Sequence, residues 1–326
     1  MEPSRFFSRQ DYYSFSQTYA QLNPATKQIE SDYAIEWSYP DPDIKIFSVI
    51  NGQKICTNNQ CEASSNPIAA ELYKTVVEVY AFFERVFKLR GIDDQGTVTN
   101  LHINWQERNA EWSCSSLNIN EVCWFTFNDA YAVTKEIVAH AYFHAILHNK
   151  LNYRGESGAL EESLADVFGI AFKHWLIDEQ ILEGPKNWWV GSFRNLSIPS
   201  SMQQYQEDLN KQGLPIYKEE NDYGYVHRNS CIPNHAFYLA CQSEGGKTWG
   251  IIAQIWFKAS QDRTLESNET FETFANRTIE KATEFGMDRI VFQAWLDVGV
   301  LSTASENNEY DEEIEGNQSQ SPEHRR

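Results

Sequence analysis

The stretch His140-Ala141-Tyr142-Phe143-His144 constrains this chain more than any other. Residues four apart on an α-helix lie on the same face, one turn above the other, so two imidazole rings at this spacing can reach a single metal ion. The surrounding sequence, roughly Ala130 to Leu147, is predicted to form the helix that carries both rings. We therefore expect the fold to be organised around a metal-binding helix.

The residue after the first histidine decides what such a site can do. In the metallopeptidase signature His-Glu-x-x-His the glutamate is the general base, and here Ala141 takes its place. A methyl group accepts no proton from a metal-bound water, and loss of one positioned acid–base group costs about 10²- to 10⁴-fold in rate. The sequence predicts metal binding with little or no peptidase activity. Either an introduced Glu-to-Ala substitution or a natural loss of catalysis would explain it.

A third metal ligand is predicted in the amphipathic helix from Glu156 to Trp175. Catalytic zinc usually takes three protein ligands and keeps a fourth position for water. Glu162 and Asp166 lie four apart on one helix face, so one can bind the metal while the other accepts the second ring N–H of a histidine. A solvated acidic face is the weaker interpretation. Because His148 continues the histidine row, a site made of histidines alone is a further alternative.

Composition excludes several classes of partner. The 326-residue chain has 46 Asp and Glu against 27 Lys and Arg, a formal net charge of -19 that repels phosphate backbones and anionic membrane surfaces. No apolar run reaches the length of about 18 residues that a membrane-spanning helix needs. The N-terminal segment lacks the pattern of a signal peptide. A cytoplasmic location, export by a non-standard route and secretion after removal of a leader all stay open.

The cysteines leave the redox state undecided. None has the Cys-x-x-Cys spacing of a zinc ribbon or redox pair. Disulfides and isolated thiols are both compatible with their spacing, because connectivity cannot be read from sequence. The six residues fall into pairs along the chain: Cys56 and Cys61, Cys114 and Cys123, and Cys231 and Cys241.

Five segments, in this order along the chain, carry a resemblance to a known family. They are Asn109-Ala110-Glu111-Trp112, Ile137 to His144, Gly155 to Asp166, Gly191-Ser192-Phe193-Arg194, and Val226-His227-Arg228-Asn229-Ser230. From roughly Ile44 to Val300 the chain resembles the thermolysin-like neutral metallopeptidases, with the sharpest matches in these segments.

The resemblance implies a set of metal-binding residues. It makes His140, His144 and Glu162 the ligands of one zinc ion, with Asp166 orienting His140. Zinc in such a site polarises the substrate carbonyl and acidifies a water molecule.

The resemblance also implies residues that hold and polarise a peptide. Tyr153 and His227 would stabilise the oxyanion of a tetrahedral intermediate, with Asp222 holding His227 in the required tautomer. Arg194 would hydrogen-bond the substrate backbone beyond the scissile bond.

Specificity would come from a strand edge and an apolar pocket. Asn109 and Ala110, in the same segment as Trp112, are implied to lie on an edge strand that aligns the peptide by backbone pairing. An apolar pocket for the residue after the cut would select bulky hydrophobic side chains. Its implied members are Ile137, Val190 and Phe193.

The chain departs from the family at its main calcium site. Glu136 is present, but Lys173 and the segment Lys186-Asn187-Trp188-Trp189 stand where acids are expected. Calcium requires several hard oxygen ligands. We therefore expect no calcium there and a lysine ammonium in place of the cation.

The predicted fold class is α+β, a two-lobed thermolysin-like metallopeptidase. The predicted function is a zinc endopeptidase without its general base, and the alternative is a non-catalytic zinc-bound module that binds peptides or proteins in the same cleft. The expected organisation is a leader arm or short inhibitory prosegment over 1–39 that contacts the cleft, a β-rich lobe with one long helix over 40–130, the zinc helix over 131–149, a helical lobe over 150–301, and an acidic disordered tail over 302–326.

Overall fold

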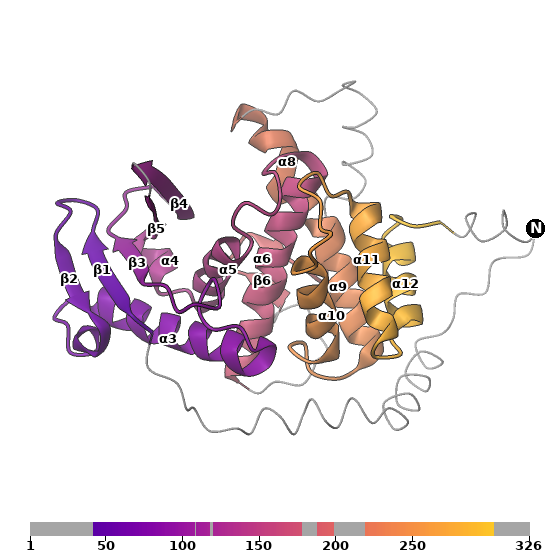
Figure 1. The fold of residues 1–326 in the computed structure, drawn as a ribbon, viewed down its shortest axis with the longest axis horizontal. Helices are drawn as coiled ribbons and strands as arrows, with labels where there is room; N and C mark the ends of the chain where they lie inside the picture. The colour runs from indigo at the N-terminus through magenta and orange to yellow at the C-terminus, as the bar shows by residue number, and fades with distance from the viewer. Residues whose placement is uncertain (1–41, 108, 118–119, 178–187, 199–218, 303–326) are drawn as a thin grey trace, which may run out of the picture.

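The structure is a computed structural model that describes residues 42–107, 109–117, 120–177, 188–198 and 219–302. A mixed β-sheet occupies one side, two long helices cross the middle, and a group of helices forms the other side (Figure 1). This arrangement is the predicted α+β class, with a β-rich N-terminal part and a helical C-terminal part. The predicted N-terminal arm and nearly all of the acidic tail lie outside the described residues.

The sheet has five strands in the order β2-β1-β3-β5-β4. β1 pairs in parallel with β3, and β3 with β5, whereas β2 and β4 pair antiparallel with their neighbours. β4 is therefore an edge strand, as the resemblance predicted for the segment that begins at Ala110. The strands are β1 (Ile44–Ser48), β2 (Lys54–Thr57), β3 (Thr99–Ile103), β4 (Ala110–Leu117) and β5 (Asn120–Phe127).

The long helix that the sequence predicted in this lobe is α3 (Pro67–Phe87). The Asn66 side chain accepts hydrogen bonds from the backbone N–H groups of Ile68 and Ala69, which caps the otherwise unpaired first turn. The helix ends at Phe87, because the next residue, Lys88, adopts a left-handed conformation with φ of 59°.

The predicted metal-binding helix is divided in two. A short α4 (Asp129–Ala132) precedes α5 (Lys135–Ile146), whereas one helix from about Ala130 was expected. Thr134 separates them because its backbone is extended, with φ of -100° and ψ of 103°, and its hydroxyl donates to the Ala130 carbonyl. Side chains that bond to nearby backbone compete with helical hydrogen bonds in this way.

The C-terminal part of the described chain is mainly helical. Long α6 (Gly155–Leu176) lies beside α5, and a short β6–β7 pair follows it (Figure 1). The other elements are β6 (Trp189–Val190), β7 (Arg194–Asn195), α8 (Asp222–Asn229), α9 (Cys231–Glu244), α10 (Ile251–Ser260), α11 (Phe271–Thr283) and α12 (Asp288–Asp297). Within the described ranges, no helix has the length and apolarity needed to cross a membrane.

Aromatic side chains join α5 and α6 to both sides of the molecule. The rings of Phe143 and Phe168 stack with centroids 4.1 Å apart. Phe87 on α3 lies 5.3 Å from Phe168 and 4.5 Å from Phe257 on α10. Such offset and edge contacts add to the stabilisation from buried apolar area. One continuous core therefore runs from the sheet side to the helical side through the two central helices.

The two central helices also meet at Gly169. A Cβ atom built there would lie 2.6 Å from the backbone oxygen of Glu136 and 3.5 Å from the Cβ of His140. Real Cβ atoms do not approach a backbone oxygen that closely, so only glycine allows this spacing. The absence of a side chain at Gly169 thus brings α6 against the first turns of α5, directly beside His140.

Two disulfides settle part of what the sequence left open. Cys56 is bonded to Cys61 and Cys114 to Cys123. The remaining pair, Cys231 and Cys241, are buried thiols of α9.

Gly169→Ala is expected to destabilise the fold by about 1–3 kcal/mol, because an added methyl group must push α5 and α6 apart. Intrinsic helix propensity predicts the opposite sign, a gain of about 1 kcal/mol for alanine over glycine inside a helix. Urea unfolding followed by circular dichroism distinguishes the two. An equal or higher free energy of unfolding in the variant would show that the helices are not in the described contact.

Candidate metal centre and peptide cleft

Three side chains from the central helices converge on one point. His140 and His144 project from α5, and Glu162 from α6. The Nε2 atoms of the two histidines are 3.1 Å apart. Glu162 Oε2 lies 3.6 Å from His140 Nε2, and Glu162 Oε1 lies 3.5 Å from His144 Nε2. The three predicted zinc ligands therefore form one group.

This geometry fits a tetrahedral metal ion. Bonds of about 2.0–2.2 Å from zinc to nitrogen or oxygen give ligand–ligand distances of about 3.3–3.6 Å in a tetrahedron, close to the observed separations. Glu162 is 2% exposed, and its Oε2 atom has no hydrogen-bond partner among the described residues. A buried carboxylate oxygen without such a partner is costly, and a bound cation would satisfy it. The residues present fit zinc.

Carboxylates hold the far sides of both imidazole rings. His140 Nδ1 lies 2.9 Å from Asp166 Oδ1, the partner that the resemblance implied. His144 Nδ1 lies 2.9 Å from Glu161 Oε1. Sequence reasoning did not assign Glu161 this role, although its position next to Glu162 was a usable signal. Such partners orient a ring so that the other nitrogen faces the metal.

Opposite charges surround the buried acids. Arg194 donates to Asp166 through Nε at 2.6 Å and through its terminal nitrogen at 2.7 Å. Burial alone would raise the pKa of Glu162, but three histidines and Arg194 lower it to about 2. Burial likewise opposes ionisation of Asp166, and the Arg194 guanidinium outweighs it and lowers the pKa. Glu162 is thus held as the anion, the form that binds a cation.

Tyr153 and His227 lie on the open side of this group. The Tyr153 hydroxyl donates to Glu162 Oε1 at 2.6 Å and lies 3.5 Å from His227 Nε2. His227 Nδ1 is 2.8 Å from Asp222 Oδ1, and its backbone N–H donates to the other carboxylate oxygen at 3.0 Å. Asp222 therefore holds both the ring and the backbone of His227, leaving Nε2 directed toward Glu162 at 3.4 Å.

The backbone before His227 is unusual. Asp222, Tyr223 and Tyr225 have φ values of 52°, 50° and 61°, and Gly224 has 95°. Left-handed conformations at residues other than glycine cost of order 1–3 kcal/mol each and cluster at functional sites. The sequence did not predict this turn, which brings the Asp222 carboxylate back onto His227.

The predicted peptide-pairing segment lies where β4 begins. Asn109 precedes the strand and its side chain accepts from the Ala110 N–H at 2.9 Å. Trp112 points elsewhere: its ring centroid is 4.5 Å from that of Phe125, and its indole N–H lies 3.4 Å from His148 Nδ1. Trp112 thus contacts Phe125 in the sheet and His148, which follows α5.

The residues predicted to form the specificity pocket lie close together. Gly191 is flanked by Ile137 and Phe193: an added Cβ would lie 3.1 Å and 2.7 Å from their side chains. Ile137 and Val190 are buried, whereas Phe193 is 44% exposed. An apolar surface with one exposed aromatic ring therefore lies near the N-terminal half of α5.

Ala141, which lies between the two histidines in sequence, is 1% exposed and packs within the hydrophobic core.

His148 does not join the pair of His140 and His144. Its ring lies against Cys114 instead, with Nε2 3.8 Å from the sulfur. The alternative of a site built from three histidines is therefore not supported by the positions of these rings.

Sequence comparison relates the chain to metallopeptidases. The family model of the thermolysin metallopeptidase α-helical domain matches residues 149–300. An extracellular metalloprotease of Pectobacterium carotovorum subsp. carotovorum is 32% identical over 263 residues, covering 73% of this chain and 75% of that protein. The neutral protease NprE of Bacillus pumilus is 30% identical over 234 residues, covering 70% and 74%.

A solved structure shares the fold. The precursor of protealysin, a metalloproteinase from Serratia proteamaculans, superposes with a TM-score of 0.67 and 24% identity, covering 88% of this chain and 98% of that chain. Fold and site together define a zinc metallopeptidase architecture. The chain belongs to the thermolysin-like metallopeptidase family.

Asp166→Asn is expected to weaken zinc binding about 10- to 100-fold, because His140 loses the carboxylate that orients its ring. The zinc dissociation constant can be measured by competition with a chromogenic chelator, with circular dichroism as the check on folding. Glu284→Gln, which removes only an exposed ion pair with Lys258, serves as the control. A folded Asp166→Asn chain with unchanged zinc affinity would contradict the assignment.

Proposed function

We propose that this chain has the metal-binding and substrate-binding residues of a zinc endopeptidase but lacks the general base. It would bind zinc and peptide with little hydrolysis. The observation that carries the proposal is the convergence of two imidazole nitrogens and a buried carboxylate at metal-ligand distances. His140, His144 and Glu162 would hold the ion. Zinc would supply a polarised carbonyl and a water of lowered pKa.

The residues beside the metal group support a peptide substrate, the substrate class of the protease relatives. Tyr153 and His227 would donate hydrogen bonds to the oxygen of the scissile carbonyl as negative charge develops on it. Asp222 Oδ1, 2.8 Å from His227 Nδ1, would accept a hydrogen bond from the Nδ1 proton and stabilise the imidazolium, which carries a second proton on Nε2 to donate. Arg194 would meet the substrate backbone beyond the scissile bond from its place beside Asp166.

Peptide alignment and specificity are further parts of the proposal. An extended peptide would pair with β4, the edge strand of the described sheet, from Asn109 and Ala110, because edge strands present backbone groups for pairing. The apolar group of Ile137, Val190 and Phe193 would receive a bulky hydrophobic side chain on the C-terminal side of the cut. Together these contacts would place the scissile bond over the metal group.

The missing step is proton transfer. Ala141 takes the position of the glutamate in the metallopeptidase signature, and its methyl group can neither accept nor deliver a proton. The acids and bases around it remain in place: Asp166, Glu161 and Asp222 all contact a histidine. This intact setting fits a glutamate-to-alanine substitution in an otherwise complete peptidase site.

The same observation supports a second candidate function. A chain that keeps its metal ligands and peptide contacts but lacks the general base would act as a zinc-bound module that binds peptides or proteins without cutting them. Peptide binding alone does not distinguish the endopeptidase from the binding module, since both would retain the cleft. The effect of the residue at position 141 on hydrolysis does distinguish them.

Ala141→Glu is expected to raise the rate of peptide hydrolysis by about 10²- to 10⁴-fold, because it supplies the absent acid–base group. Cleavage of an unfolded protein, followed by mass spectrometry, measures the gain and gives the cut positions. A zinc chelator should abolish it. Ala141→Gln is the matched control, since glutamine has nearly the same shape and cannot accept the proton.

Two outcomes would count against the endopeptidase proposal. Equal rates for the glutamate and glutamine variants would show that position 141 does not act as a base. A folded, zinc-loaded Ala141→Glu chain that remains inactive would favour the binding module.

We also propose that a lysine replaces calcium beside α5. The Lys173 ammonium lies 3.3 Å from Glu136 Oε1 and 3.0 Å from the Trp189 carbonyl oxygen. The Gly191 N–H also donates to Glu136 Oε1 at 3.3 Å. The Lys173 ammonium thus contacts the Glu136 and Trp189 oxygens, which could otherwise bind a metal cation. Lys186 and Asn187, which belong to the same expectation, lie outside the described residues.

Calcium is therefore expected to leave the melting temperature of the chain unchanged. Lys173→Glu should lower it in the absence of calcium, through repulsion with Glu136, and millimolar calcium should restore part of the loss because hard oxygen ligands replace the ammonium. Lys173→Met is the control: it removes the cation without adding a ligand, so calcium should not rescue it. Stoichiometric calcium in the unaltered chain would overturn the proposal.

A further inference from the structure

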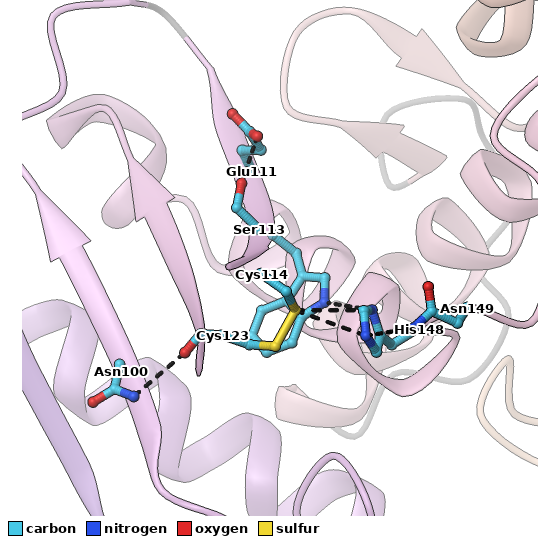
Figure 2. Close-up of a disulfide and its surroundings, with 8 residues drawn as sticks. Asn100, Glu111, Ser113, Cys114, Cys123, His148 and Asn149 are labelled. Carbon is cyan, nitrogen blue, oxygen red and sulfur yellow. Dashed lines mark hydrogen bonds between the residues drawn. A yellow bond between two sulfur atoms is a disulfide. The ribbon is translucent and has the colours of Figure 1, made fainter. Parts of the chain in front are cut away.

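A cross-strand disulfide lies next to a histidine at the end of the zinc-helix segment. Cys114 on β4 and Cys123 on β5 are directly opposite each other in the antiparallel register. Figure 2 shows the disulfide with the His148 ring beside it. All three side chains are partly buried. None of them belongs to the metal group described above.

The position of the His148 ring is defined by its contacts. The Cys114 sulfur lies 3.9 Å from Nδ1 and 3.8 Å from Nε2. The indole N–H of Trp112 lies 3.4 Å from Nδ1, and the Asn149 side-chain amide lies 2.7 Å from Nε2. The imidazole is therefore held with its nitrogens within reach of a sulfur atom from the neighbouring hairpin.

We propose that Cys114, Cys123 and His148 form a second, thiol-dependent metal site that becomes available when the disulfide is reduced. The candidate ligand atoms all lie within 4.8 Å of one another. Tetrahedral zinc with bonds of about 2.3 Å to sulfur and about 2.0–2.1 Å to nitrogen requires sulfur–nitrogen distances of about 3.6 Å and sulfur–sulfur distances of about 3.8 Å. The distances from the Cys114 sulfur to the two imidazole nitrogens, 3.9 and 3.8 Å, are close to the required value.

For a metal ion to bind both cysteines, the two sulfur atoms must first separate. A dithiol reductant transfers two electrons to the disulfide, the S–S bond breaks, and the reductant leaves as its own cyclic disulfide with two cysteine thiols formed on the protein. Binding of a divalent cation then forms two metal–thiolate bonds and releases two protons. Water fills the fourth position. The ligand set of two thiolates and one imidazole suits Zn²⁺ and other thiophilic metals.

The site would join parts of the structure that the disulfide does not. The disulfide links β4 to β5 within one hairpin, whereas His148 follows α5, the helix with the proposed zinc ligands. A bound ion would therefore tie the hairpin to the end of that helix segment. β4 is also the edge strand on which a peptide is proposed to pair, so occupancy of this site would restrain one wall of the cleft.

The chain contains a matched comparison for this site. Cys56 and Cys61 form the other disulfide, but no third metal-binding side chain accompanies them among the residues that the structure describes. Reduction of that pair releases two thiols without a histidine. The group of His140, His144 and Glu162 contains no sulfur, so its spectrum with a coloured metal ion differs from that of a thiolate site.

The test titrates the full chain with cobalt(II) in anaerobic buffer, before and after reduction with a phosphine. The phosphine takes up oxygen from water as the disulfide becomes two thiols, and it avoids competition by added thiols. The reduced chain is expected to bind one more equivalent of cobalt than the oxidised chain and to show a sulfur-to-cobalt charge-transfer band. Zinc should displace the cobalt and remove the band.

Variants assign the ligands. The band should be lost in Cys114→Ser/Cys123→Ser and retained in Cys56→Ser/Cys61→Ser. His148→Ala, which keeps the disulfide for folding, should lower cobalt affinity of the reduced chain by about tenfold or more, at least the cost of losing an outer-shell partner.

Several results would overturn the proposal. They are the absence of an additional equivalent in the reduced chain, a band that persists without Cys114 and Cys123, and unchanged affinity in His148→Ala. Far-UV circular dichroism before and after reduction is part of the test. A chain that unfolds on reduction would also refute the site, because the three ligands come from elements that only the fold brings together.

Discussion

The contact between α5 and α6 is the constraint on which the rest of this structure depends. Gly169 lets the backbone of α6 approach Glu136 and His140, and the Phe143 and Phe168 rings stack 4.1 Å apart further along. The proposed zinc ligands come from both helices, so their separation is set by this packing. Because close-packed interiors resist small displacements, the metal geometry is built into the core and does not depend on a loop.

Burial of charge is the second organising condition. Glu162 and Asp166 are 2% and 0% exposed, and isolated charges at such depth are unstable. Arg194 and the histidines compensate them, and a bound cation would complete the balance at Glu162. The contacts with Arg194 and the histidines that stabilise the buried carboxylates therefore also direct two imidazole nitrogens and one carboxylate to a common point.

Ala141 separates metal and peptide binding from hydrolysis in the proposed site. Its small methyl group is 1% exposed and packs in the core without needing a polar partner. In the proposal, metal and peptide contacts come from groups that are present, whereas hydrolysis would need a proton acceptor at position 141. The proposed loss of hydrolysis would therefore leave the structure of the site in place.

Local signals in the sequence were sufficient for the elements with strong periodicity or caps. Asn66 and Pro67 mark the start of α3, and the four-residue spacings predicted that His140 would share a face with His144, and Glu162 with Asp166. The break at Thr134, the left-handed turn from Asp222 and the partnership of His144 with Glu161 were not anticipated. Each of these depends on a competing hydrogen bond or on a neighbour distant in sequence.

By itself, then, the sequence indicated the strongly periodic helices and the side chains able to bind a metal, because helical periodicity and side-chain chemistry are properties of short segments. The α+β class and the choice of Glu162 as third ligand came from the family resemblance. Only the tertiary structure decided which carboxylate holds which ring, how Lys173 meets Glu136, and that His148 belongs beside Cys114 and not with the other histidines. Those relations are set by packing between helices and strands that lie far apart along the chain.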